Sequence, residues 1–228
     1  MATPKRRLEV SHDLRVFEDV SALAAATAQH IGDVARRAVE HRGSCTLAVS
    51  GGRTPSRMFH ELATLEVPWA SIVIFQVDER VAPADDDDRN LVALRASLGS
   101  APAVIDPMPV NDADIHQAAH EYAARLPDRF DLVHLGLGSD GHTASLVSGD
   151  PILEDSDDLV GVSTVYRGQR RMTMTLRALS RADEILWVVS GAEKRLSLRH
   201  LLAGNQLIPA GRVSAARSIV MADRAAIS

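Results

Sequence analysis

Four apolar runs of strand length dominate this sequence, and each of them stops in a cluster of glycines or charges. The runs are CTLAVSGG (45–52), SIVIFQVDER (71–80), DLVHLGLG (131–138) and EILWVVSG (184–191). Near-continuous apolar strands are typical of parallel sheets, whose two faces are both buried. The sequence therefore predicts an α/β fold with a mostly parallel sheet and helices on both of its faces.

Segments with helical periodicity separate the apolar runs. We expect helices over the ranges 21–43, 54–65, 90–98, 112–126 and 192–204. The first of them is expected to begin at a Ser21 cap and to end at Gly43. Shorter extended segments are expected at 7–13, 14–20, 101–110, 158–164, 170–179 and 217–223. The alternation runs through all 228 residues without a linker or a repeat, which predicts one α/β domain over residues 1–228.

The composition argues against several classes of protein. A net charge of −5 disfavours a nucleic-acid partner, since phosphate backbones attract basic surfaces. No apolar stretch approaches the length of a membrane span, and the basic N-terminus lacks the apolar segment of a secretory signal. The single cysteine, Cys45, cannot form an internal disulfide, which is consistent with a reducing compartment. We expect a cytoplasmic protein, either a monomer or a small homo-oligomer.

Parallel α/β sheets bind ligands at the carboxyl ends of their strands, so the strand ends are the places to look for function. The first is SGGRTPS (50–56). Gly51 and Gly52 let the backbone approach a ligand, and the N–H groups of the following helix would complete an anion cradle with Thr54 and Arg53. The alternative is a tight turn in which Thr54 only caps the helix. The Walker pattern of nucleotide P-loops is absent.

The third strand ends in GLGSDGH, where His142 directly follows Gly141. An imidazole titrates near neutral pH, so a histidine at a strand end is a candidate general base. Asp140 could orient the ring or a water molecule, and the alternative is a histidine with a structural role only. The glycines match G-x-G-x-x-G, but Asp140 is badly placed to receive a pyrophosphate, and no dinucleotide cofactor is expected.

Other charged residues lie directly before or after the remaining strands. Asp78, Glu79 and Arg80 end the second strand and are candidate substrate contacts. A carboxylate there could also hold the arginine rigid for an anionic substrate. They could also simply mark where the strand meets water. Arg171 and Lys194 are candidate phosphate contacts, or else ordinary surface cations. The histidine and aspartate spacings match no metal-site pattern, so no metal is expected.

The motifs LAVSGGRTP, QVDERVAP, GLGSDGHTASL, RMTMT and VVSGAEKR follow one another as they do in the 6-phosphogluconolactonases, which the chain resembles from about residue 15 to residue 222. The resemblance implies a Rossmann-like α/β architecture, shared with glucosamine-6-phosphate deaminases and ribose-5-phosphate isomerase. It also implies the hydrolysis of a small sugar-phosphate substrate, 6-phospho-D-glucono-1,5-lactone, in the oxidative pentose phosphate pathway. No cofactor or metal is implied.

The resemblance also implies roles for individual residues. The histidine of DGHT is taken as the general base in that family, so His142 would activate a water molecule that attacks C1. Arg80 is the candidate for a substrate contact that could also stabilise the oxyanion. The phosphate would rest on backbone and cationic groups from several strand ends: Gly51, Gly52, Thr54, Arg171 and Lys194.

Two details depart from the family pattern. Arg89 stands where a serine usually precedes the asparagine after DER, and HTASL continues as VSGDP instead of with phenylalanine and proline. Two alternative functions stay open. One is a glucosamine-6-phosphate deaminase or sugar-phosphate isomerase, although the Asn-Glu-Pro of that branch is absent. The other is a non-catalytic sugar-phosphate sensor, although His142, Asp78 and Arg80 are all retained.

Overall fold

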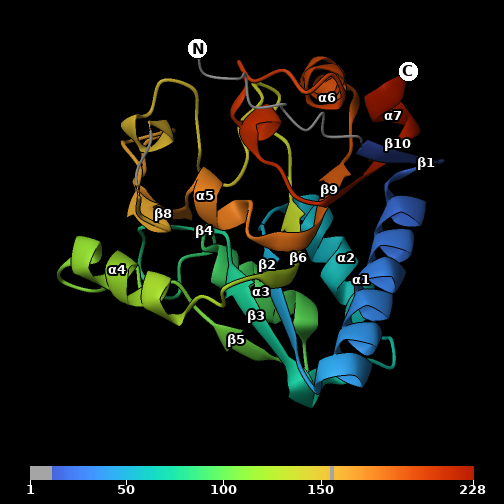
Figure 1. Cartoon of the computed structure of the whole chain (residues 1–228), viewed down its shortest axis with the longest axis horizontal. Coiled ribbons are helices and arrows are strands. Elements are labelled where there is room, and N and C mark those ends of the chain that lie inside the picture. Colours follow the sequence, from blue (N-terminus) through green and yellow to red (C-terminus); the bar gives the residue numbers. More distant parts are fainter. Residues whose placement is uncertain (1–11, 155–156) are drawn as a thin grey trace, which may run out of the picture.

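The computed structural model describes residues 12–154 and 157–228, and its centre is a parallel sheet of seven strands in the order β1-β10-β9-β6-β2-β3-β5 (Figure 1). Every neighbouring pair in this sheet is parallel, as predicted. The strands are β1 (His12–Phe17), β2 (Cys45–Val49), β3 (Ile72–Gln76), β5 (Val104–Asp106), β6 (Phe130–Leu135), β9 (Ala182–Val189) and β10 (Arg217–Asp223).

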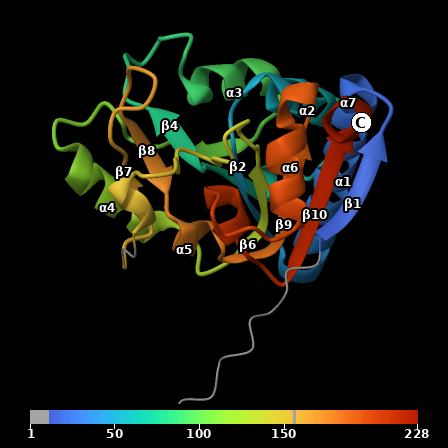
Figure 2. The same cartoon turned by 90° about the horizontal axis from the view of Figure 1, so that it is seen from above.

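A second, antiparallel sheet stands beside the first and has the order β4-β8-β7 (Figure 2). Its strands are β4 (Asp78–Arg80), β7 (Val160–Val162) and β8 (Arg171–Met174). The prediction of one strand over 71–80 is therefore wrong in its second half. The chain changes sheet at Val77, whose N–H donates to the carbonyl of Val49 at 3.0 Å and whose carbonyl accepts from Met174 N–H at 2.7 Å.

Helices cover both faces of the parallel sheet, as predicted. One face carries α1 (Val20–Arg42), α2 (Arg53–Ala63) and α3 (Asn90–Leu98). The other face carries the second sheet together with α4 (Ile115–Arg125), α5 (Leu176–Leu179), α6 (Arg195–Leu202) and α7 (Arg224–Ile227). The short 3₁₀ helices are η1 (Trp69–Ser71), η2 (Pro151–Leu153), η3 (Ala192–Lys194) and η4 (Pro209–Arg212).

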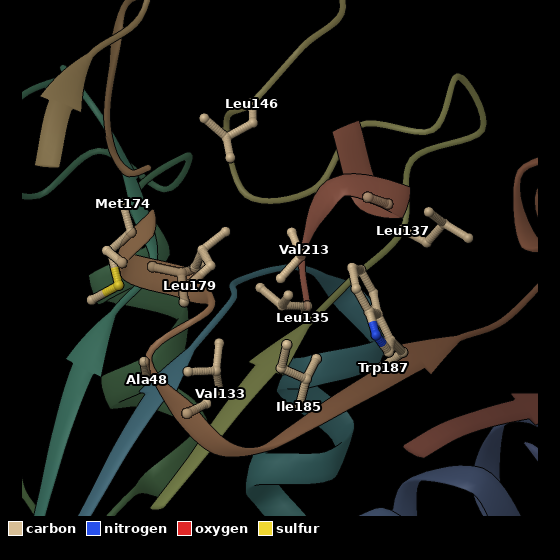
Figure 3. Close-up of a cluster of buried hydrophobic side chains, with 14 of the residues drawn as sticks. Ala48, Val133, Leu135, Leu137, Leu146, Met174, Leu179, Ile185, Trp187 and Val213 are labelled. Atoms are coloured by element: carbon tan, nitrogen blue, oxygen red, sulfur yellow. The ribbon is translucent and has the colours of Figure 1, made fainter. Parts of the chain in front are cut away.

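The alternation of side chains along the strands explains why both faces are buried. Leu132 of β6 packs into the core beneath α1, α2 and α3. Val133 and Leu135 point to the opposite core, where they meet Ile185 and Trp187 of β9 (Figure 3). Successive strand residues face opposite sides of a sheet, so an apolar run such as DLVHL supplies two cores at once.

The first helix and the first strands differ in detail from the prediction. The cap of α1 is Asp19, whose Oδ1 accepts from the N–H groups of Ser21 and Ala22 at 2.9 Å, so Ser21 is not the cap. The helix ends at Gly43 as predicted, because φ of 76° there suits glycine. Residues 7–11 of the first predicted strand lie outside the described residues. The rest of that strand pair forms β1 alone, which runs parallel to β10.

Strand order marks the place of the candidate site. The chain passes from β2 to β3 and β5 on one side and then returns to β6 on the other side of β2. Ligands of open α/β sheets bind at such a reversal, at the carboxyl ends of the strands. None of the helices within the described residues has the length and apolar character needed to cross a membrane.

Candidate active site

The loop after β6 holds His142 against Asp140. Nδ1 of His142 lies 2.5 Å from Oδ1 of Asp140, and the backbone N–H of His142 donates to the same oxygen at 3.2 Å. The imidazole side chain is 22% exposed, so water and substrate can reach it. Because the carboxylate engages Nδ1, Nε2 is the ring nitrogen placed to take a proton.

Two glycines of this loop leave room for neighbouring side chains, one of them the histidine. A β-carbon added to Gly138 would lie 2.1 Å from Nδ1 of His142, and one added to Gly141 would lie 2.6 Å from the side chain of Ile208. Gly141 also has φ of +85°, which side chains rarely tolerate. The G-x-G-x-x-G pattern therefore serves a tight turn at the histidine.

Tyr166 completes the surroundings of Asp140, and no motif in the sequence indicated it. Its hydroxyl donates to Oδ2 of Asp140 at 3.1 Å. Partial burial raises the pKa of Asp140, but the charge of His142 and the hydrogen bonds from His142 and Tyr166 outweigh burial and leave this pKa below its ordinary value. Asp140 is thus held as a carboxylate beside the ring.

Asp78, at the start of β4, is buried with 8% of its surface exposed. The hydroxyl of Ser145 donates to its Oδ2 at 2.5 Å, and the side-chain amide of Asn90 donates to its backbone carbonyl at 2.9 Å. Burial raises the pKa of Asp78, while the Ser145 bond and the charge of Arg171 oppose that shift without cancelling it. Ser145 and Asn90 were not singled out from the sequence.

Glu79 lies in the interior, 0% exposed, so no atom of it is available to touch a ligand directly. It forms an ion pair with the buried Arg89, with 3.1 Å between Oε2 and Nε. Its oxygens also accept hydrogen bonds of 2.7–3.0 Å from the N–H groups of Arg80, Asn90 and Leu91 and from the side chain of Gln76. Glu79 therefore fixes the start of α3 beneath the site. The structure gives it this support in place of the predicted substrate contact.

Arg80 and Arg171 sit on neighbouring strands of the second sheet and differ in their surroundings. Nη1 of Arg80 donates to Oδ1 of Asn90 at 3.0 Å and also to the carbonyl of Asp88. Arg171 is 8% exposed, its Cζ lies 5.3 Å from the centre of the Tyr166 ring, and its buried Nε has no hydrogen-bond partner within the described chain. The positive charge of Arg171 is held in place over the Tyr166 ring, where it can attract an anion.

The glycine turn after β2, the candidate anion cradle, leads directly into α2. Gly52 begins α2 with φ of +124°, and no side chain caps the helix. Thr54 does not cap it either, because Thr54 Oγ1 bonds to Ser190 Oγ of the loop after β9 at 2.7 Å. A β-carbon on Gly51 would lie 2.2 Å from Oδ1 of Asn90, so the turn packs against the residue that holds Arg80. Arg53 is exposed at the helix start.

Lys194 lies just before α6, whereas the sequence predicted it in the first turn of that helix. It ends η3 and precedes the first residue of α6, and it is half-buried. Thr54 and Ser190 join the loop after β9 to the cradle, which brings the segment that carries Lys194 to the same edge of the sheet. In residues 12–154 and 157–228, no cluster of three or more His, Cys, Asp or Glu side chains is arranged to hold a metal ion.

Known proteins resemble this chain in sequence and in fold. The family model for glucosamine-6-phosphate isomerases/6-phosphogluconolactonase matches residues 18–221. A 6-phosphogluconolactonase from Synechocystis sp. is 36% identical over 181 residues, or 73% of this chain and 75% of that protein. One from Rhizobium meliloti is 35% identical over 199 residues, or 82% and 85%. The crystal structure of 6-phosphogluconolactonase from Thermotoga maritima matches with a TM-score of 0.85 and 26% identity, over 94% of this chain and 100% of that one.

Proposed function

The chain belongs to the family of glucosamine-6-phosphate isomerases and 6-phosphogluconolactonases, and from this we propose that it hydrolyses 6-phospho-D-glucono-1,5-lactone to 6-phosphogluconate in the oxidative pentose phosphate pathway. The observation that carries the proposal is the contact between Asp140 and His142 at the end of β6. It supplies a positioned base in a family whose relatives are named for this hydrolysis.

The reaction needs one base and no covalent intermediate. Nε2 of His142 takes a proton from water while the water oxygen attacks C1 of the lactone. The carbonyl becomes a tetrahedral oxyanion, the bond between C1 and the ring oxygen breaks, and the proton passes from the imidazolium to the leaving ring oxygen. Asp140 orients the ring through Nδ1 and stabilises the imidazolium, as the aspartate of a catalytic triad does.

The cations divide between the two ends of the substrate. Arg171 lies over Tyr166, whose ring also contacts His142, and we assign its guanidinium to the oxyanion that forms at C1. Arg80 is tied to Asn90 beside the cradle, so we assign it to the phosphate end. These two assignments exchange the roles implied by the family resemblance, in which Arg80 contacts the oxyanion and Arg171 the phosphate.

Backbone and polar groups would complete the phosphate end. The N–H groups of a glycine turn at a helix start attract phosphate, and a lysine adds a compact positive charge. We place the phosphate on Gly51, Gly52, Thr54 and Lys194, with Arg53 at the rim. Asp78 would accept from a sugar hydroxyl, with Gly141 lining the C1 end.

We also propose that the protein works in the cytoplasm as a monomer or a small homo-oligomer, without nucleic-acid, membrane or cofactor partners. The net charge of −5 and the single cysteine support this assignment.

The test is a coupled assay of freshly generated lactone, with the spontaneous hydrolysis rate subtracted. Wild type is expected to turn over rapidly, and His142→Ala to lose about 10²–10⁴-fold in kcat. His120→Ala removes an exposed histidine of α4 and serves as the matched control. Because the family includes isomerases, glucosamine 6-phosphate is the second substrate to assay. Turnover of that compound without turnover of the lactone would reject the proposal.

A further inference from the structure

Tyr166 contacts both the His142–Asp140 pair and the cation Arg171 of the candidate site. Its hydroxyl donates to Oδ2 of Asp140 at 3.1 Å. Its ring meets the His142 ring at a steep angle of 64°, with the two centres 5.7 Å apart. The guanidinium of Arg171 lies over the same ring at 5.3 Å. One side chain therefore joins the base, its carboxylate and the buried cation.

The hairpin between β7 and β8 is built to hold Tyr166 in this place. Arg167 and Gly168, the two residues that follow it, have φ of 51° and 82°. Two successive positive φ angles make the tight turn whose twist suits a β-hairpin. Nearer to β7, the N–H and the hydroxyl of Thr164 donate to Oδ2 of Asp150 at 2.9 and 2.7 Å. The ring is thus fixed by an ordered turn and by an anchored strand end.

The two contacts of Tyr166 have different consequences. Asp140 uses Oδ1 for His142 and Oδ2 for Tyr166, so the second bond sets the plane of the carboxylate and with it the direction of Nε2. The ring supports Arg171, whose Nε has no hydrogen-bond partner in the described part of the chain. An aromatic face holds the guanidinium without using its N–H groups, so the two terminal nitrogens, which are not buried, stay available to an anion.

We propose that Tyr166 is a positioning residue for the hydrolysis. Its hydroxyl fixes Asp140 so that Nε2 of His142 faces the attacking water, and its ring holds Arg171 at the C1 end of the substrate. This inference rests on the proposed function.

Two variants separate the two contacts. Tyr166→Phe removes the hydroxyl and keeps the ring, so we expect kcat to fall about tenfold, the effect of one lost hydrogen bond to a charged group, with little change in KM. Tyr166→Leu also removes the aromatic face of Arg171, the group assigned to the oxyanion at C1, so kcat should fall further. The Kd of 6-phosphogluconate, which carries a carboxylate at C1, should rise about threefold to tenfold. A residue that only maintained the fold would not divide kcat from KM in this way.

The other tyrosine of the chain supplies a matched control. The Tyr122 hydroxyl bonds to the backbone of Gln76 beneath the parallel sheet. Tyr122→Phe therefore removes a buried hydroxyl without touching Asp140 or Arg171. It is expected to lower the free energy of unfolding and to leave kcat and KM of the folded enzyme unchanged.

Proton NMR gives a readout that needs no turnover. The downfield signal of the His142 Nδ1 proton, assigned by its loss in His142→Ala, should move in Tyr166→Phe and stay in place in Tyr122→Phe. Unchanged kinetics and an unchanged signal in Tyr166→Phe would overturn the positioning role. If wild type fails to hydrolyse the lactone but the signal still moves, the proposed function fails and the positioning of His142 by Tyr166 stands.

Discussion

Gly138 leaves the space that the ring of His142 occupies, since a β-carbon at position 138 would lie 2.1 Å from Nδ1. The backbone at both ends of the turn is also fixed, because the N–H of Gly138 donates to the carbonyl of His142 at 2.8 Å. The ring can therefore occupy this position only while residue 138 has no side chain.

Gly138→Ala should displace the imidazole and lower kcat/KM of lactone hydrolysis about 100-fold, because a base misplaced by about 1 Å loses that much. The fold should persist, since the change is confined to one loop. Gly136→Ala is the control, because a β-carbon there would meet no atom within 4 Å. Wild-type kcat/KM in Gly138→Ala would show that His142 is not the base or that the loop relaxes freely.

Glu79→Gln tests whether the buried carboxylate of the DER motif stabilises the structure beneath the site. The amide would turn a donor toward backbone N–H groups that now donate to Glu79, and it would leave the buried Arg89 without its counter-charge. Breaking a buried ion pair in this way costs about 3–5 kcal/mol, which urea unfolding at neutral pH would measure. Asp13→Asn breaks the exposed pair with Arg15 and should cost about 1 kcal/mol or less. Equal losses in the two variants would contradict the supporting role of Glu79.

Much of the fold could be predicted because its signals are local. The apolar runs and the helical periods identified six strands of the parallel sheet within a few residues, while β1 was predicted as two strands, and the helix over 90–98 has the predicted bounds. The change of sheet at Val77 could not be predicted. Residues 71–80 look continuous in sequence, and only the pairing of β4 with β8, about 90 residues further along the chain, separates them.

Some residues of the candidate site could likewise be predicted from local signals, and others could not. Glycines and charges at strand ends pointed to Gly51 and His142 because parallel strands bring their carboxyl ends together. Tyr166 had no such signal, since it comes from the tip of a hairpin and reaches Asp140 only through the tertiary fold. The burial of Glu79 could not be predicted either. A charged residue at a strand end is expected to be exposed unless its buried partners are known.

Asp78→Asn should make the protein more stable and less active. Burial raises the pKa of Asp78, so the folded state holds the carboxylate charge less readily than the unfolded chain does, and the wild type loses stability as the pH rises above the ordinary value of 3.8. Asparagine carries no charge, and the Ser145 hydroxyl can rotate to accept its N–H.

Thermal unfolding at pH 4 and pH 7 would measure this effect. We expect the variant to gain stability relative to wild type at the higher pH, with lower lactone turnover because the anionic acceptor is gone. A variant less stable than wild type at pH 7 would show that the bond from Ser145 and the neighbouring Arg171 outweigh the cost of burial.

His134 makes the folded state sensitive to acid. It is 0% exposed at the end of β6, its Nδ1 accepts from the Ser50 N–H at 3.3 Å, and its Nε2 has no hydrogen-bond partner among the described residues. Burial lowers its pKa from 6.5 to about 3. The folded state therefore favours the neutral ring. The resulting contribution of His134 to the free energy of unfolding is complete above pH 6.5 and is lost as the pH falls toward 3.

His134→Leu should remove that dependence. Between pH 6.5 and about 3 the wild type should lose about 1.4 kcal/mol of unfolding free energy per pH unit more than the variant does. Urea titrations of both proteins at several pH values give this difference directly, and groups common to both, such as His12, cancel. Parallel pH curves would mean that the ring gains a proton without unfolding, and that the space around Nε2 admits a water molecule or a counter-ion.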